Sequence, residues 1–252
     1  MPDSKSLKWR NQRRHLHGLA QTSFRVMPSL TQLLGDHGRL LVLDAASTCT
    51  QVGILSATAP ALWHQAPEEA GTAIFMGTES LLERSGCTLS DIHAFVFCAG
   101  PGSMLGTRTI AMALRTWQVI APHPIYTYQS LAIAARYAWA QMPGRSFGVI
   151  ADARRDTWHY QPISATGNLP PLQRLPASAL PLGEWLTPEN FRAWALPPHP
   201  AATCSYDLAK IFPALGDGDY FTATAAPDAF QHEAPVYKKW SAQIHQTPPR
   251  PA

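Results

Sequence analysis

The chain has 252 residues, of which 46% are hydrophobic, and it carries a formal net charge of +3. This length allows one large domain or two small ones, each with a packed core. Residues 1–37 hold six Lys or Arg against two Asp or Glu, whereas the remaining residues hold 14 against 15. The body is therefore close to neutral, which argues against a protein that binds nucleic acid through its own basic surface.

The four cysteines, Cys49, Cys87, Cys98 and Cys204, show no C-x-x-C spacing. Such scattered thiols are typical of reduced, mostly buried side chains rather than of a metal site or disulfide framework. No part of the sequence approaches the roughly 18 consecutive apolar residues of a membrane span. We therefore expect a cytoplasmic protein that makes no contact with a membrane.

The first 37 residues are basic and lack the continuous apolar segment of a secretory signal. We interpret them as a disordered tail. A transit peptide, an arm that contacts RNA, and translation that starts at Met27 remain alternatives.

Residues 38–150 alternate between strand-like and helix-like segments. Residues 39–47 (RLLVLDAAS) predict a buried strand, and residues 50–57 predict its hairpin partner. Residues 68–86 predict a helix that ends at Gly86. The residues expected on its buried stripe are Ile74, Phe75, Thr78, Leu81, Leu82 and Ser85.

The following segments continue this alternation. We expect strands at 94–99, 124–128 and on both sides of a tight turn at 153–155, and helices at 105–120 and 130–142. The strand at 94–99 has no polar alternation, so we expect it to be covered on both faces. Proline becomes frequent after residue 150 and leaves little room for long regular elements. The pattern predicts an α/β fold with a shortened second part at residues 151–245.

The glycine-rich segment GPGSMLGTR begins at Gly100, directly behind a predicted strand. It lacks the lysine of a phosphate-binding P-loop, and Leu105 replaces the third glycine of the dinucleotide fingerprint. We interpret it as a sharp reversal in which Gly106 permits close contact between helix and strand. A phosphate site at this turn remains the alternative.

The hairpin DAASTCTQ resembles the phosphate hairpin of the actin, Hsp70 and sugar-kinase superfamily. Asp44 stands where that superfamily places a magnesium-positioning aspartate, and Ser47 and Thr48 supply hydroxyl groups. Ala45 and Ala46 stand where glycine would let backbone N–H groups approach phosphate. Asp44 is thus a candidate cofactor residue, but the hairpin favours a site that has lost its nucleotide.

Five segments together resemble the TsaB (YeaZ) family of bacterial tRNA threonylcarbamoyladenosine synthesis. Their order and spacing agree with that family from about residue 39 to 240. The segments lie at residues 40–55, 87–114, 130–135, 148–160 and 234–240.

The resemblance implies an actin-like (RNase H-like) fold of two half-domains with mixed sheets flanked by helices, the second half-domain trimmed. It implies a non-catalytic scaffold for TsaD, which transfers a threonylcarbamoyl group to the tRNA adenosine beside the anticodon. ATP, metal and threonylcarbamoyl-AMP would then belong to TsaD and a TsaE-like ATPase, with no cofactor or metal on this chain and tRNA bound only through the complex. The H-x-x-x-H motif that holds the metal in TsaD is absent among the ten histidines.

Three features depart from the family pattern. Met104 and Leu105 replace the usual Phe-Thr, and the helix at 68–86 lacks the customary E-H-T. Between Phe221 and Pro235 there is hardly room for the helix that usually precedes P-V-Y. These departures put the packing and role of the second half-domain in doubt.

The resemblance also implies that the two early helices pair with the equivalent helices of the partner. At 100° per residue, their outer faces carry apolar residues together with acids on one helix and arginines on the other. The predicted interface residues are Met76, Glu79, Glu83, Arg108, Met112, Arg115 and Val119.

Other interpretations stay open. The chain could be an ATP-binding enzyme of the actin/sugar-kinase class, a metallopeptidase, or a module that forms a homodimer when alone. We interpret Asp152 and Arg154 as a tight turn with a local contact, and His159 as a structural residue, rather than as catalytic groups.

Overall fold

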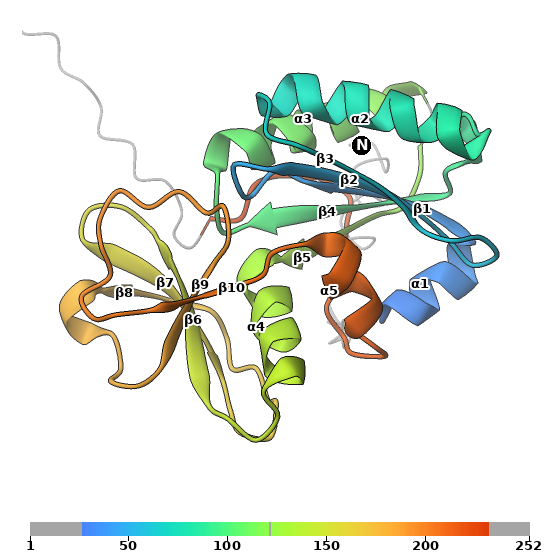
Figure 1. The fold of residues 1–252 in the computed structure, drawn as a ribbon. Coiled ribbons are helices and arrows are strands. Elements are labelled where there is room, and N and C mark those ends of the chain that lie inside the picture. The colour runs from blue at the N-terminus through green and yellow to red at the C-terminus, as the bar shows by residue number, and fades with distance from the viewer. Residues whose placement is uncertain (1–26, 121, 232–252) are drawn as a thin grey trace, which may run out of the picture.

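The computed structural model describes residues 27–120 and 122–231, which form two β-sheets with helices between and above them (Figure 1). The first sheet has the strand order β11-β5-β4-β1-β2-β3, and the second has β10-β9-β6-β7-β8. The first sheet contains β1 (Arg39–Asp44), β2 (Thr50–Ser56), β3 (Leu62–Ala66), β4 (Ala94–Gly100), β5 (Ile125–Gln129) and β11 (Thr222–Thr224). The second contains β6 (Phe147–Asp152), β7 (Thr157–Ile163), β8 (Gln173–Pro176), β9 (Trp185–Pro188) and β10 (Ala202–Cys204).

The two sheets share one topology. In the first, β1, β2 and β3 form an antiparallel meander, and β4 and β5 are added in parallel on the other side of β1. In the second, β6, β7 and β8 form the meander, and β9 and β10 are added in parallel beside β6. The chain therefore consists of two half-domains with mixed sheets, and the predicted fold class is confirmed.

The half-domains differ in the segments that connect their parallel strands. In the first, α2 (Ala70–Ser85) precedes β4 and α3 (Met104–Ile120) precedes β5. In the second, the connection to β9 contains only the short 3₁₀ helix η2 (Ala177–Ala179), and that to β10 is a loop. The described part of the second half-domain thus has no counterpart of α2 and α3. The predicted trimming concerned the segment between Phe221 and Pro235, part of which lies outside the described residues.

Three apolar clusters hold these layers together. The largest lies between the two sheets and includes α4 (Ser130–Gln141) and α5 (Leu208–Ala214), which follow β5 and β10. A second lies between the first sheet and α2 and α3, and a third covers the outer side of the second sheet. Strand β4 contributes Val96 to the first cluster and Phe95 to the second, so the prediction that it is covered on both faces is confirmed.

The amino-terminal prediction needs a correction. Residues 1–37 were expected to be a disordered tail, but α1 (Leu30–His37) is a helix whose Leu30 and Leu33 are buried. Ser29 begins the helix with a capping box that includes Gln32, a signal that the basic composition of the preceding residues hid. Residues 1–26 lie outside the described part of the chain.

The carboxy-terminal residues do not all stay with the second half-domain. Strand β11 pairs with β5 at the edge of the first sheet, and α5 packs in the cluster between the sheets. The boundary expected at residue 150 falls within β6, which runs from Phe147 to Asp152. The predicted motif at 234–240 lies outside the described residues. In the parts of the chain that are described, no helix has the length and apolar character needed to cross a bilayer.

Candidate functional site

The carboxylate of Asp44 is sealed inside the molecule at the end of β1. Its Oδ1 accepts a hydrogen bond from the backbone N–H of Ala46 at 2.8 Å. Its Oδ2 accepts hydrogen bonds from the hydroxyl groups of Tyr128 and Tyr206, each at 2.7 Å. The residue is 0% exposed, so both carboxylate oxygens face protein donors rather than a space for a metal ion or nucleotide.

The electrostatics of this cluster follow from its burial. Desolvation raises the pKa of Asp44 above its ordinary value, and hydrogen bonds from Tyr128, Ala46, Tyr206 and Cys98 oppose that shift. Burial and the nearby carboxylate also raise the pKa values of Tyr128 and Tyr206 well above the usual range, which keeps both as hydrogen-bond donors. The cluster is thus a structural tie between β1, the end of β5 and the segment that leaves β10.

The glycine turn packs directly on the hairpin that follows Asp44. A Cβ atom at Gly102 would overlap the carbonyl oxygen of Ala46, and one at Gly106 would overlap that of Ala45. The backbone N–H of Ser103 donates to the Ala46 carbonyl at 2.7 Å. The predicted close contact at Gly106 is therefore confirmed, and the start of α3 packs against the backbone of Ala45 and Ala46.

A second strand-end aspartate organises the other half-domain. Asp152 Oδ1 accepts a hydrogen bond from the backbone N–H of Arg154 at 2.6 Å, which confirms the predicted local contact. Its Oδ2 accepts from the backbone N–H groups of Trp194 and Ala195, at 2.6 and 2.9 Å. The guanidinium of Arg154 stacks on the Trp194 ring at 4.6 Å. These contacts hold the loop between β9 and β10 and leave the Asp152 carboxylate engaged with backbone donors.

The side chains that could supply metal ligands are dispersed. No group of three or more His, Cys, Asp or Glu residues within 27–120 and 122–231 is arranged to hold a metal ion. His159 lies on β7, opposite Ala151 and Arg174 in the sheet.

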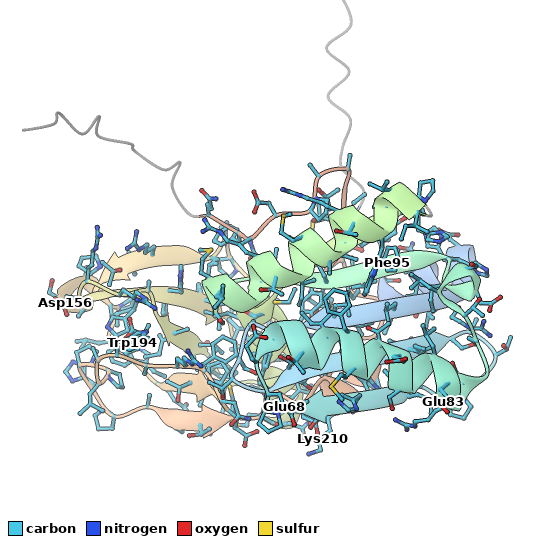
Figure 2. The ribbon with its side chains drawn as sticks, turned by 90° about the horizontal axis from the view of Figure 1, so that it is seen from above. Glu68, Glu83, Phe95, Asp156, Trp194 and Lys210 are labelled. Carbon is cyan, nitrogen blue, oxygen red and sulfur yellow. The ribbon has the colours of Figure 1, made fainter. Side chains whose placement is uncertain are left out.

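The outward faces of α2 and α3 lie side by side above the first sheet (Figure 2). On α2, Met76, Glu79 and Glu83 are exposed, whereas Ile74 and Leu81 on the opposite face are buried in the core. The helix is thus anchored along one side and offers an apolar residue flanked by acids on the other.

Helix α3 offers a longer apolar stripe. Leu105, Met112 and Val119 repeat every seven residues on its outward face and are 72%, 57% and 87% exposed. Arg108 is exposed on the same face, while Ile110 is buried against the sheet. An apolar stripe bordered by arginine has the composition of a protein interface.

A groove of about 410 Å3 lies along α3, beside Phe75 of α2. Its lining includes Phe75, Leu105, Arg108 and Met112. Phe75 was expected on the buried stripe of α2, but the residue is 52% exposed, and its ring meets that of Trp117 edge-on with the centroids 6.0 Å apart. It lies at the margin of the stripe, where α3 rather than the sheet is its neighbour. Phe75 and Leu105 extend the surface formed by the predicted interface residues. Their exposure depends on the packing of α2 against α3.

Arg115 differs from the other predicted interface residues. Its Nε donates to the carbonyl oxygen of Pro227 at 2.9 Å, and its guanidinium lies 3.7 Å from the Asp228 carboxylate. The chain's own later residues therefore contact one flank of α3. The stripe from Leu105 through Met112 to Val119 stays exposed within the described residues.

Comparisons with known proteins agree with this architecture. No family model matches the sequence, and no curated protein matches it either. Among solved structures, YeaZ from Pseudomonas aeruginosa aligns with a TM-score of 0.56 at 22% sequence identity, covering 71% of this chain and 90% of YeaZ. The fold is that of YeaZ. A second structure, an uncharacterized protein with similarity to peptidase YeaZ from Pseudomonas aeruginosa, aligns with a TM-score of 0.55 at 20% identity, covering 71% of this chain and 90% of its own.

The YeaZ fold places the predicted residues in two separate regions. Asp44 lies in the closed cluster between the two sheets, and the predicted interface residues lie on the outer faces of α2 and α3. The aspartate and the helix faces were visible in the sequence. The two tyrosines that close the aspartate were not, because they lie 84 and 162 residues away from it.

Proposed function

We propose that this chain is a non-catalytic scaffold subunit that binds a TsaD-like threonylcarbamoyltransferase and supports the formation of N6-threonylcarbamoyladenosine in tRNA, next to the anticodon. The observation that carries the proposal is the exposed apolar face of two adjacent helices that are otherwise anchored in the core. Such a face has unfavourable contact with water and is stabilised when a partner covers it.

The charges around this face could set the orientation of a partner. Glu79 and Glu83 border Met76 on α2, whereas Arg108 borders Met112 on α3. Two related helices of a partner could place opposite charges against each helix, which would steer association and fix its register. The pairing of this chain with a second copy of itself when alone remains an alternative.

The closed Asp44 cluster supports a role without catalysis by this chain. A magnesium ion would have to displace two tyrosine hydroxyl groups from a carboxylate that has no exposed surface. We therefore assign ATP, metal and threonylcarbamoyl-AMP to the partner subunits, including a TsaE-like ATPase, and expect tRNA contact only through the assembled complex. We place this complex in the cytoplasm. An ATP-binding enzyme is the alternative function.

The test uses the full chain and the TsaD-like subunit of the same organism, mixed at micromolar concentration and separated by size-exclusion chromatography with light scattering. We expect a stable heterodimer. Replacing Met112→Asp and Val119→Asp together should weaken it at least about 100-fold, because two charges would be buried without partners. If the double variant still co-elutes with the partner, the surface assignment is wrong.

A matched control separates a specific effect from a general loss of solubility. Leu182 and Leu196 are 88% and 91% exposed on the second half-domain, away from α2 and α3. Replacing Leu182→Asp and Leu196→Asp should leave heterodimer formation unchanged. Calorimetry with ATP and magnesium on the free chain tests the alternative function, which a dissociation constant below about 100 μM would favour.

A further inference from the structure

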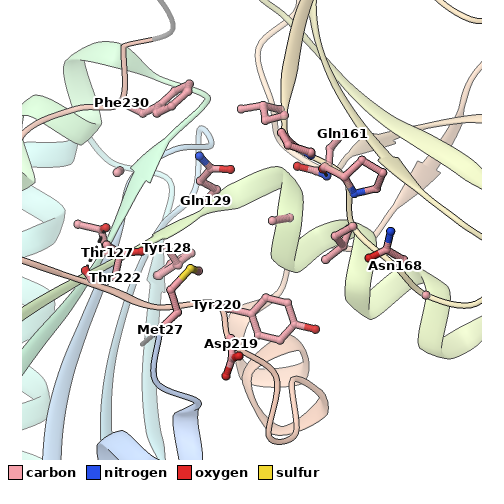
Figure 3. Close-up of a pocket in the computed structure, with 17 residues that line it drawn as sticks. Met27, Thr127, Tyr128, Gln129, Gln161, Asn168, Asp219, Tyr220, Thr222 and Phe230 are labelled. Atoms are coloured by element: carbon pink, nitrogen blue, oxygen red, sulfur yellow. Dashed lines mark hydrogen bonds between the residues drawn. The ribbon is translucent and has the colours of Figure 1, made fainter. Parts of the chain in front are cut away.

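Two hollows lie at the junction of the half-domains. The larger has a volume of about 580 Å3 and lies between Gln129 and Gln161 (Figure 3). Asp219 belongs to its lining, and the guanidinium of Arg136 lies against Gly167 of the same lining. Because these two groups have opposite charges, this hollow selects no class of ligand by its charge.

The smaller hollow is a cleft of about 280 Å3 between the start of α3 and the second half-domain. Its volume is close to the lower limit for sites that hold a small molecule. Met104 and Leu105 of α3 belong to one wall, and residues 151–154 and the loop at 191–194 contribute the other. Trp194, labelled in Figure 2, stands on this second wall. We call this hollow the arginine cleft.

Two guanidinium groups line the arginine cleft. Arg154 and Arg192 are both exposed, and neither guanidinium forms an ion pair or donates a hydrogen bond to any residue that the structure describes. Of the described lining residues, the only acid is Asp152. The lining therefore carries two positive charges and one negative charge, a net of +1, which matches an anion of single charge.

Asp152 holds this site in place. Its Oδ1 accepts a hydrogen bond from the backbone N–H of Arg154 at 2.6 Å, and its Oδ2 accepts from that of Trp194, also at 2.6 Å. The Arg154 guanidinium in turn stacks on the Trp194 ring, 4.6 Å from its centroid. A planar group that is already stacked loses less freedom when it binds an anion. A ligand would therefore meet a cation that is already oriented.

The other side chains of the cleft select the remainder of the ligand. Met104 and Leu105 expose apolar surface on one wall, and Phe191 adds a half-buried ring on the other. A guanidinium binds either carboxylate or phosphate through two parallel hydrogen bonds. A phosphate monoester, with a charge of about −1.5 to −2, would exceed the net charge of the lining and place oxygens against apolar groups. A carboxylate has a single charge and can be attached to an apolar body.

We propose that the arginine cleft binds a small organic acid in which one carboxylate is attached to a flat apolar body. The carboxylate accepts hydrogen bonds from Arg154 and Arg192, and the apolar body covers Met104 and Leu105. This inference does not depend on the docking of a partner, because the site is complete in the free chain. Either proposal can therefore fail without the other.

The test is an NMR titration of the full, ¹⁵N-labelled chain with benzoate, followed at the arginine Nε–H and tryptophan indole resonances. We expect a dissociation constant on the order of 1 mM. Benzamide has the same shape without the charge and should bind at least about tenfold more weakly. Acetate has the charge without the ring and should also bind at least about tenfold more weakly. No benzoate binding at about 10 mM, or equal binding of benzamide or acetate, would overturn the proposal.

Variants of the arginines locate the site. Arg154→Gln and Arg192→Gln each remove one charge of the lining, so either should weaken benzoate binding at least about tenfold. Arg155→Gln is the matched control, because Arg155 is exposed on the same turn but does not line the cleft. It should bind benzoate as the unaltered chain does. Equal weakening in Arg155→Gln and Arg154→Gln would show that benzoate responds only to the general positive charge of the turn, and would overturn the assignment. Resonances far from the cleft report whether each variant keeps its fold.

The class of anion is tested in the same titration with inorganic phosphate and with ATP and magnesium. We expect both to bind more weakly than benzoate, because the net charge of the lining is only +1. If either bound more tightly than benzoate and lost affinity in Arg154→Gln, the cleft would be a phosphate site and the proposal would be wrong.

Discussion

The two half-domains share a strand topology but cover the outer sides of their sheets in different ways. The first uses the long helices α2 and α3, which bury one face and leave the other exposed. The second uses a 3₁₀ turn and loops over a cluster that includes Trp158 and Trp185. A helix packed on a sheet has a second face that a partner can contact. In a loop folded over large aromatic rings, by contrast, the side chains already pack on those rings. The difference indicates why the docking surface that we propose lies on one half-domain.

The aspartates at the ends of β1 and β6 show the same divergence. Each accepts a hydrogen bond from the backbone N–H two residues later, Asp44 from Ala46 and Asp152 from Arg154. The second oxygen of Asp44 binds two buried tyrosine hydroxyl groups, but that of Asp152 binds the backbone of the loop at Trp194. The same turn geometry therefore joins the two half-domains at Asp44, whereas at Asp152 it holds a surface loop.

The largest expected effect tests the aromatic cover of the second half-domain. Trp158 is 2% exposed and packs with Ile150, Leu180 and Trp185. We expect Trp158→Ala to lower the free energy of unfolding by about 3–5 kcal/mol, because it opens a cavity that loops cannot fill. Urea denaturation followed by circular dichroism measures this change.

The control for that substitution is Trp194→Ala. Trp194 is largely exposed and stacks only with Arg154 within the ring contacts of the described residues, so its loss should cost about 1 kcal/mol or less. If both variants lowered the free energy of unfolding equally, the loops would not pack on Trp158 as the comparison of the two half-domains requires.

The next effect tests the tie at Asp44. Asp44→Ala leaves the hydroxyl groups of Tyr128 and Tyr206 buried without their acceptor, and we expect a loss of about 2–4 kcal/mol. The pKa of Asp44 is raised on folding, so the stability linked to its proton is present below about pH 3.8 and is lost as the pH rises through the folded pKa. The difference between the two proteins should therefore be largest in acid and decrease as the pH rises.

Urea titrations of both proteins between pH 3 and pH 7 measure that difference. A gap that widens with increasing pH would show that the carboxylate is stabilised rather than penalised by its surroundings. Asp152→Ala serves as the comparison at the other strand end, where the carboxylate is partly exposed and bound to a surface loop. We expect a smaller loss of stability there.

The sequence predicted most of the first half-domain because its signals are local. Apolar runs indicated β1, β2 and β4, and the stripe from Ile74 to Leu81 indicated which face of α2 is buried. The face of α3 that carries Met112 and Val119 followed from the same periodicity. Strand β3 was missed because its five residues are mostly half-buried and show no extended apolar run.

The remainder depends on contacts between distant residues. The partners that close Asp44, the loop held by Asp152, and the pocket between Gln129 and Gln161 each join segments that are far apart along the chain. Their residues carry no spacing that would connect them before the chain folds. The second half-domain was also harder to predict, because loops replace its crossover helices and remove the helical periodicity on which such predictions depend.

The smallest effect tests how α3 is seated, and it contrasts two glycines of the same half-domain. Gly106 is in contact with the Ala45 carbonyl, so Gly106→Ala should push α3 away from the hairpin and cost about 1–3 kcal/mol. Gly35 in α1 has no atom within 4 Å of an added Cβ, so Gly35→Ala should stabilise the chain by up to about 1 kcal/mol through helix propensity. Thermal and urea denaturation measure whether each substitution stabilises or destabilises the chain. If Gly106→Ala were also stabilising, α3 would not be held against the hairpin, and its outer face would no longer be a fixed surface for a partner.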